Sequence, residues 1–309
     1  MKTNLKRLCT RWKEEKRKWV KESTYATYVQ HINCLLLPFF SESESIGEAD
    51  VQRYVDEKIS DGLSPKTVRD SLNVLKMVLK YGAKLGCWDY QEFTVHFPKG
   101  TRSSAGIKIL DRRQRQILAS YLAEHPSLKN LGLMICIQSG LRLGEVCALQ
   151  WKDMDVKAGI IHIRKTISRV WLSDGDEKSC TLRIGTPKTD SSLRDIPMSS
   201  SLLKSVKPFK RNFKDDCFVI SGTPQPLEPR GYREYFYRLL NKLGLPKVHF
   251  HALRHGFASG CIESKCDYKT VSAILGHASI ATTLNMYVHP GYDDKKRCIE
   301  QMTKVLGVK

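Results

Sequence analysis

The stretch HFHALRHGFASGCI, residues 249–262, places three side chains with a shared chemical use where a helix is expected to begin. His251, Arg254 and His255 cluster at this opening, and apolar residues follow them along one helical face. An arginine in this place can hold an anion through two parallel hydrogen bonds while a neighbouring histidine donates a third. The segment therefore predicts an anion site, although His251 on a simpler interpretation only caps the helix.

Two upstream segments carry charged residues that are ordinary when taken alone. In SGLRLGEVCALQW, residues 139–151, Arg142 and Glu145 are spaced to share a helical face, which by default indicates a surface ion pair. In TPKTDSSLRDIP, residues 186–197, Lys188 follows Pro187 and is typical of a solvated turn.

A downstream segment, SAILGHASIATTLNMYVHP at residues 272–290, supplies a histidine and a tyrosine. Gly276 predicts the end of a helix, which leaves His277 on a tight turn. Tyr287 is one of twelve tyrosines, and by itself it is expected to be a half-buried ring with one hydrogen bond.

Together the four segments contain the groups that a metal-free attack on a phosphodiester requires. Arginines match the nonbridging oxygens, a lysine can protonate the departing alkoxide, histidines can assist proton movement, and a tyrosine hydroxyl can attack phosphorus. The candidates for these roles are Arg142, Arg254, Lys188, His251, His277 and Tyr287. A covalent intermediate conserves the bond energy for rejoining, so neither a cofactor nor a metal is expected.

The composition favours a nucleic-acid partner. The 309 residues include 51 Lys and Arg against 32 Asp and Glu, and the net charge of +19 attracts a polyanion. A membrane-surface protein would share this charge, but no lipidation signal or secretion signal is visible, and no apolar stretch is long enough to cross a membrane. The ten cysteines include no C-x-x-C pair. A cytoplasmic protein with reduced thiols and no metal site is therefore expected.

The order of patterns along the chain predicts two domains. Residues 1–96 have helical periodicity, with Ser64 and Pro65 starting a long helix and Pro38 expected to help end an earlier one. Residues 97–109 have the composition of a cationic linker, and a capping box of Asp111 with Gln114 opens the second domain, residues 110–309. Residues 160–170 and 181–197 alternate, which predicts a small sheet with turns near 173–175 and 188–192.

Five motifs in order, R-L-G-E, P-K-T, H-x-L-R-H, L-G-H and Y-x-H, resemble the tyrosine recombinase (phage integrase) family over roughly residues 105–295. The helical region before them is similar to the family's core-type, SAM-like DNA-binding domain. The resemblance implies a mainly α fold with a small antiparallel β-sheet, a two-domain C-shaped clamp around double-stranded DNA, a 3′-phosphotyrosyl intermediate and a tetrameric synapse.

The resemblance also implies a role for each matching residue. Arg142 and Arg254 would hold the scissile phosphate, Lys188 would be the general acid for the 5′ oxygen, and Tyr287 would be the nucleophile. The supporting residues would be His251 and His277, which assist proton transfer, and Glu145, which braces Arg142 or a neighbouring histidine.

Other residues have less specific expectations. The motif histidines His255 and His289 are expected to be structural, and Lys66 and Arg69, at the start of the Pro65 helix, are candidates for DNA contact. Near the C-terminus an apolar stripe is expected to dock on a neighbouring protomer or on its own domain; its residues are Ile299, Met302 and Leu306.

The sequence departs from one pattern of the family, and this difference bears on the subclass. The spacing from His277 to Tyr287 is one residue longer than in Xer-type chromosome resolvases, which favours an integrase of a mobile element, with an accessory directionality factor as a further partner. The alternatives are an Xer-type dimer resolvase, a type IB topoisomerase-like enzyme and a noncatalytic DNA-binding regulator.

Overall fold

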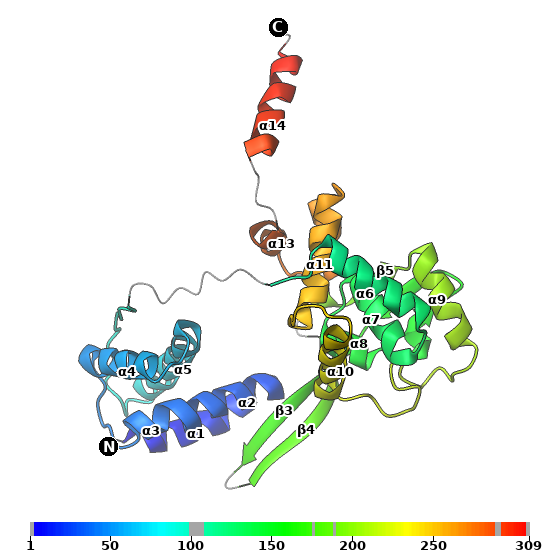
Figure 1. The fold of residues 1–309 in the computed structure, drawn as a ribbon. Helices are drawn as coiled ribbons and strands as arrows, with labels where there is room; N and C mark the ends of the chain where they lie inside the picture. Colours follow the sequence, from blue (N-terminus) through cyan, green and yellow to red (C-terminus); the bar gives the residue numbers. More distant parts are fainter. Residues whose placement is uncertain (1–2, 99–107, 175–176, 188–189, 288–291, 307–309) are drawn as a thin grey trace. The chain divides into compact units, whose positions relative to one another are not determined.

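The structure is a computed structural model that describes residues 3–98, 108–174, 177–187, 190–287 and 292–306 (Figure 1). It is mainly helical, with small antiparallel sheets, as predicted. The chain divides into two compact units, residues 1–106 with 169–182 and residues 107–168 with 183–309, which we call the N-terminal and C-terminal units. The finer boundaries of the linker at 97–109 stay a prediction, because most of that segment lies outside the described residues.

The N-terminal unit is a helical bundle around an apolar core. Its helices are α1 (Leu5–Arg17), α2 (Glu22–His31), a π-helical turn (Ile32–Leu36), α3 (Leu37–Phe40), α4 (Glu48–Ser60) and α5 (Pro65–Lys84). The predicted start of α5 is confirmed, because the Ser64 hydroxyl accepts a hydrogen bond from the Thr67 amide at 3.1 Å and Pro65 is the first helical residue.

The expectation that Pro38 ends a helix is wrong. α2 ends at His31, the chain continues helically through the π-helical turn, and Pro38 lies in the first turn of α3. A proline is tolerated there because the amide hydrogen that it lacks has no partner at a helix start. The helical path therefore runs on to Phe40.

The C-terminal unit contains the remaining helices and a three-stranded sheet. Its helices are α6 (Arg112–Glu124), α7 (Leu128–Ser139), α8 (Leu143–Ala148), α9 (Ser200–Lys210), α10 (Pro229–Lys242), α11 (His251–Glu263), α12 (Tyr268–Leu275), α13 (Ile280–Tyr287) and α14 (Tyr292–Val305). The predicted capping box at α6 is confirmed, since the Gln114 amide donates to Asp111 at 2.8 Å and the Asp111 amide donates to Gln114 at 3.0 Å.

The strands form two sheets where the sequence predicted one. β1 (Met154–Asp155), β2 (Ile160–Ile163) and β5 (Arg194–Pro197) are antiparallel in the order β1-β2-β5, with Ile161 opposite Ile196. β3 (Thr166–Asp174) and β4 (Glu177–Gly185) form a separate two-stranded sheet. The inward residues of β2 and β5 lie in the apolar core, and this shared burial sets the register between the two strands, which are distant in sequence. Residues 175–176 and 188–189, in the predicted turns, lie outside the described residues.

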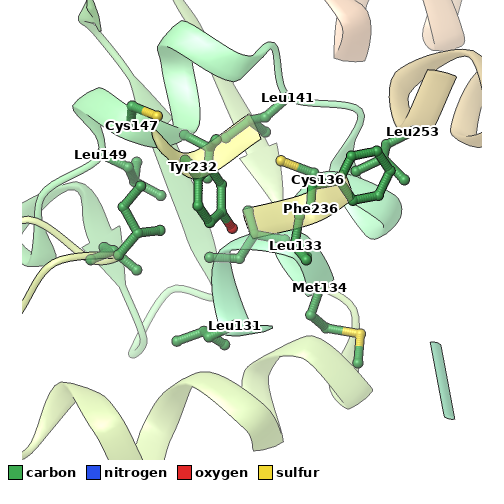
Figure 2. Packing of buried hydrophobic residues seen from close by; sticks show 14 of the residues in the cluster. Leu131, Leu133, Met134, Cys136, Leu141, Cys147, Leu149, Tyr232, Phe236 and Leu253 are labelled. Atoms are coloured by element: carbon green, nitrogen blue, oxygen red, sulfur yellow. The ribbon is translucent and has the colours of Figure 1, made fainter. Parts of the chain in front are cut away.

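Helix α7 lies at the centre of the C-terminal core. Leu133 and Cys136 of α7 pack with Tyr232 and Phe236 of α10, and all four side chains are buried (Figure 2). The Tyr232 hydroxyl donates to the Lys129 carbonyl at 2.7 Å, which gives this buried polar group a partner. This contact lies in the first turn of α7, whereas the candidate site follows the C-terminal end of the helix, after Ser139.

The cysteines are free thiols. Among the described residues, no group of three or more His, Cys, Asp or Glu side chains is arranged to hold a metal ion. Within the same ranges, no helix has the length and apolar character that a membrane crossing needs.

Candidate active site

Arg142 and Glu145 form the first part of the site, where the chain leaves α7 and begins α8. The Glu145 carboxylate is only 2% exposed and accepts hydrogen bonds from the Arg142 amide at 2.9 Å and from Arg142 Nη1 at 2.8 Å. This pair is therefore not the surface ion pair that its spacing alone would suggest. Glu145 holds both the backbone and the side chain of Arg142.

The other end of the Arg142 guanidinium reaches the turn that carries His277. Its Nη2 donates to the Gly276 carbonyl at 3.2 Å. Gly276 ends α12 in the left-handed conformation, with φ 65°, as its position in the sequence predicted. A side chain there would also meet the Ser191 carbonyl at 2.8 Å. The turn thus depends on glycine and ties Arg142 to His277.

Arg254 of α11 is 1% exposed and lies beside the end of α7. Its Nη1 donates to the Gly140 carbonyl at 3.0 Å, whereas its buried Nη2 has no hydrogen-bond partner within the described ranges. Burial, and then the positive charge of Arg142, lower the pKa of Arg254 to about 9, so the side chain remains charged at neutral pH. An unpaired buried guanidinium nitrogen is costly unless an anion completes it.

His251 and His277 are held in the neutral form by their surroundings. Loss of solvent, followed by repulsion from the protonated form of His255 and from Arg254, lowers the pKa of His251 to about 4, although the residue keeps an exposed edge. Loss of solvent, then Arg254 and Arg142, lowers the pKa of His277 to about 4 as well. Both rings are therefore available as proton acceptors at neutral pH.

Tyr287, the last residue of α13, points its hydroxyl at His255. The hydroxyl lies 2.6 Å from His255 Nδ1, and the two ring centroids are 5.5 Å apart. Burial raises the pKa of Tyr287, while the charges of Arg254 and Arg142 oppose that rise. The His255 ring thus contacts the candidate nucleophile, and the expectation that it is structural stays a prediction.

Four further residues were singled out from the sequence. Lys188 and His289 lie outside the described residues. Lys66 and Arg69 belong to the N-terminal unit, where Lys66 forms an exposed ion pair with Asp70 at 3.0 Å. The Arg69 guanidinium lies over the Phe97 ring, 4.2 Å from its centroid.

Two residues near the site were not predicted. Arg194 of β5 is buried and bonded to Glu145, and Thr283 of α13 is buried with its hydroxyl 2.8 Å from His277 Nδ1. The alternation in SLRDIP places Arg194 on the same inward face as Ile196, and a charge on that face was a usable signal. Thr283 had no comparable signal, because its partner lies across a turn.

The chain is similar to known proteins over most of its length. Residues 108–293 match the phage integrase family, and residues 4–59 match the N-terminal SAM-like domain of phage integrases. The chain is 26% identical over 280 residues to a tyrosine recombinase XerC-like protein of Caldanaerobacter subterraneus subsp. tengcongensis, covering 83% of this chain and 71% of the relative. It is 26% identical to the tyrosine recombinase XerC of Xanthomonas axonopodis pv. citri, covering 81% and 75%.

Solved structures share the fold. The Tn1549 transposon integrase in complex with transposon right end DNA aligns with a TM-score of 0.79 at 22% identity, covering 97% of this chain and 100% of that one. A lambda integrase tetramer bound to a Holliday junction aligns with a TM-score of 0.68 at 16% identity, covering 94% and 80%.

Proposed function

The chain belongs to the phage integrase family of tyrosine recombinases, which are DNA strand-transfer enzymes, and from this premise we propose how its own residues perform the reaction. The proposed activity is site-specific DNA recombination, in which Tyr287 forms a 3′-phosphotyrosyl intermediate. The observation that carries the proposal is the convergence of two arginines, one with an unpaired buried nitrogen, beside the hydroxyl of Tyr287.

Arg142 and Arg254 are proposed to bind the scissile phosphate. The two guanidinium groups are close enough that the charge of Arg142 lowers the pKa of Arg254. Glu145 compensates part of this repulsion, and a phosphate oxygen at the free Arg254 Nη2 would satisfy the remainder. Charged donors fixed in advance stabilise the negative charge on the nonbridging oxygens in the transition state, which is the main source of catalysis in such sites.

Tyr287 is proposed to attack phosphorus within its own protomer. Its hydroxyl is hydrogen bonded to His255 of the same chain, and its side chain packs against the small apolar cluster of Ala258, Val271 and Leu275. Because the surroundings lower the pKa of His255, chiefly through burial and then through Arg254, this ring is neutral and its Nδ1 can accept from the hydroxyl. Attack forms the Tyr287–phosphorus bond, breaks the bond to the 5′ oxygen and releases a 5′ hydroxyl.

Lys188 is proposed as the acid that protonates the departing 5′ oxygen. His251 and His277 are proposed to assist, since both are neutral without DNA and a bound phosphate would favour their protonation. Rejoining reverses these proton movements with a 5′ hydroxyl from the second duplex. No nucleotide cofactor takes part in either step.

The assembly around this site is also a proposal. The N-terminal helices would bind DNA through basic residues such as Lys66 and Arg69, and four protomers would form the synapse. Lambda integrase, which shares the fold, forms a tetramer on a Holliday junction. In α14 the apolar residues Ile299 and Met302 are 68% and 54% exposed, which suits contact with a neighbouring protomer. A cytoplasmic location and an accessory directionality factor complete the proposal.

Two subclasses have support. The spacing between His277 and Tyr287 favours an integrase that inserts or excises a mobile element. The XerC relatives favour a dimer resolvase. Recombination between the two ends of the DNA that flanks the coding gene would support the first, and resolution of a plasmid dimer that carries a chromosomal site would support the second.

The test of the activity uses a recognition duplex, defined as the fragment of this flanking DNA that the full chain binds most tightly, with a nick beside the cleavage point. The nick traps the covalent intermediate. Tyr287→Phe removes one oxygen and is expected to abolish the covalent complex while DNA binding is retained. A covalent complex in this variant would overturn the assignment of Tyr287.

The same duplex separates the alternatives. Relaxation of supercoiled plasmid without dependence on the recognition sequence would indicate a type IB topoisomerase-like enzyme. Binding without any covalent complex in the unsubstituted protein would indicate a noncatalytic DNA-binding regulator.

A further inference from the structure

Among the residues that the structure describes, Arg194 is the most buried cation without a role in the proposed reaction. Its side chain is 6% exposed and makes a two-pronged contact with Glu145, from Nη2 to Oε2 at 2.9 Å and from Nη1 to Oε1 at 3.1 Å. Glu145 is therefore shared by two arginines, one facing the proposed phosphate site and one behind it. A fork of this kind fixes the plane of a carboxylate as well as its charge.

Arg194 also holds the turn that precedes His277. Its Nε donates to the Ile274 carbonyl at 2.6 Å, and its Nη1 donates to the Ser192 carbonyl at 3.1 Å. Arg194 Cδ would lie 3.1 Å from a side chain at Gly276, the residue whose carbonyl accepts from Arg142. A single guanidinium thus links β5, the end of α12 and Glu145.

We infer that Arg194 is a positioning residue for strand cleavage, which acts through Glu145 on Arg142 and through the end of α12 on His277. The inference rests on the proposed recombinase function and extends it. Arg142 receives its orientation from two acceptors, Glu145 and the Gly276 carbonyl, and Arg194 touches the structure around both. Without Arg194, both acceptors are free to shift, and Arg142 shifts with them.

The effect of Arg194 on the pKa of Glu145 gives the positioning role a measurable pH dependence. Burial by itself raises the pKa of Glu145, but the hydrogen bond and charge of Arg194, followed by those of Arg142, lower it overall. Loss of Arg194 removes the larger opposing contribution, so the pKa of Glu145 rises. Arg194 also lowers the pKa of His277, and that effect is lost in the same direction. The charge of Glu145 also raises the pKa of three neighbouring groups, which are Arg254, His251 and Cys136.

The test compares three variants in single-turnover cleavage of the nicked recognition duplex at saturating protein. Arg194→Gln is expected to cleave on the order of 100-fold more slowly, since small misplacements of a catalytic group cost about this much, while duplex affinity is unchanged. The acidic limb of its pH–rate profile is expected to move to higher pH. Arg194→Lys keeps the charge but not the fork, so its rate is expected to be intermediate, with a smaller displacement of the limb.

The matched control is Arg164→Gln. Arg164 donates to the Arg194 carbonyl at 3.0 Å and pairs with Asp195, but it contacts neither Glu145 nor the end of α12 in the described contacts. Its rate and pH profile are expected to match those of the unsubstituted protein. Should Arg194→Gln fail to fold, Arg194→Lys carries the comparison.

The outcomes are distinct. Cleavage by the Arg194 variants at the unsubstituted rate, or slow cleavage with an unmoved acidic limb, would overturn the positioning role while leaving the recombinase function intact. Failure of the unsubstituted protein to form any covalent complex would instead overturn the proposed function.

Discussion

The two units of the chain use charge in opposite ways. In the N-terminal unit, Lys66 and Asp70 pair on the surface one helical turn apart, with 84% and 46% of their side chains exposed. The C-terminal unit buries Glu145 at 2% exposure between Arg142 and Arg194, which come from different parts of the chain. The buried polar contact of α4 and α5 is neutral, a 2.7 Å bond between the hydroxyls of Tyr54 and Ser71.

The contrast between exposed and buried charge distinguishes residues that stabilise the fold from residues that hold charge in place for catalysis. Exposed pairs contribute little to folding, so apolar burial must stabilise the N-terminal helices. A buried ion pair seldom adds net stability over an apolar one, but it leaves charges at fixed positions. In the C-terminal unit the buried ion pairs lie where a phosphate would bind. Their desolvation costs stability, but the fixed charge there contributes to catalysis.

The largest expected effect is on cleavage and comes from the buried arginine. Arg254→Lys removes the fork but keeps a charge, and cleavage of the nicked duplex is expected to fall by about 10³-fold, as for the loss of a fixed transition-state donor. The matched control Arg69→Lys, in the N-terminal unit, is expected to change DNA affinity but not the rate of the bound complex. Equal cleavage rates in the two variants would contradict the view that fixed charge acts in catalysis in the C-terminal unit and not in the N-terminal unit.

The next effect is on the stability of the N-terminal unit. Leu75 is fully buried in its core, and Leu75→Ala is expected to lower the free energy of unfolding by about 3 kcal/mol through lost burial and a residual cavity. Urea denaturation monitored by circular dichroism measures this change. A loss below about 1 kcal/mol would mean that apolar packing is not what holds these helices together.

A smaller effect concerns acid stability of the C-terminal unit. The pKa of His251 and of His277 is about 4 when folded, below the ordinary histidine value of about 6.5 expected in the unfolded chain. The unfolded chain therefore binds more protons between these values, and stability is lost as pH falls from about 6.5 to about 4. The loss is on the order of 1 kcal/mol, reduced by solvent screening.

Thermal melting at pH 7.5 and pH 5 reads out this effect. His277→Asn is expected to make the two melting temperatures more similar than they are in the unsubstituted protein. An unchanged difference would show that His277 does not resist protonation in the folded state.

The smallest effect on stability is expected on the N-terminal surface. Lys66→Met removes an exposed pair and should leave the melting temperature nearly unchanged. If Lys66 contacts phosphate, duplex affinity falls and the slope of log affinity against log salt decreases by about one. An unchanged salt slope would remove Lys66 from the DNA-binding surface.

The features that the sequence predicted correctly depend on neighbours along the chain. Ser64 with Pro65 starts α5, Asp111 with Gln114 starts α6, and Gly276 ends α12, because each signal acts within one helical turn. Pro38 failed as a stop signal because a proline serves equally well in the first turn of the next helix.

The features that were missed depend on contacts between distant residues. Arg194 meets Glu145 across 49 positions, and the Tyr287 hydroxyl meets His255 across 32. Local periodicity carries no information on which distant charges meet, and the pairing of β2 with β5 was hidden for the same reason. The order of the motifs predicted which residues would form the candidate site. How their side chains are oriented could be seen only in the folded structure.

The proposed reaction requires that Tyr287 becomes linked to the 3′ phosphate of the cleaved strand. The most direct measurement is mass spectrometry of the covalent complex between the unsubstituted protein and the nicked recognition duplex, after digestion with nuclease and protease. We expect a single nucleotide-bearing peptide with the phosphate on Tyr287. A nucleotide attached to any other residue would contradict it.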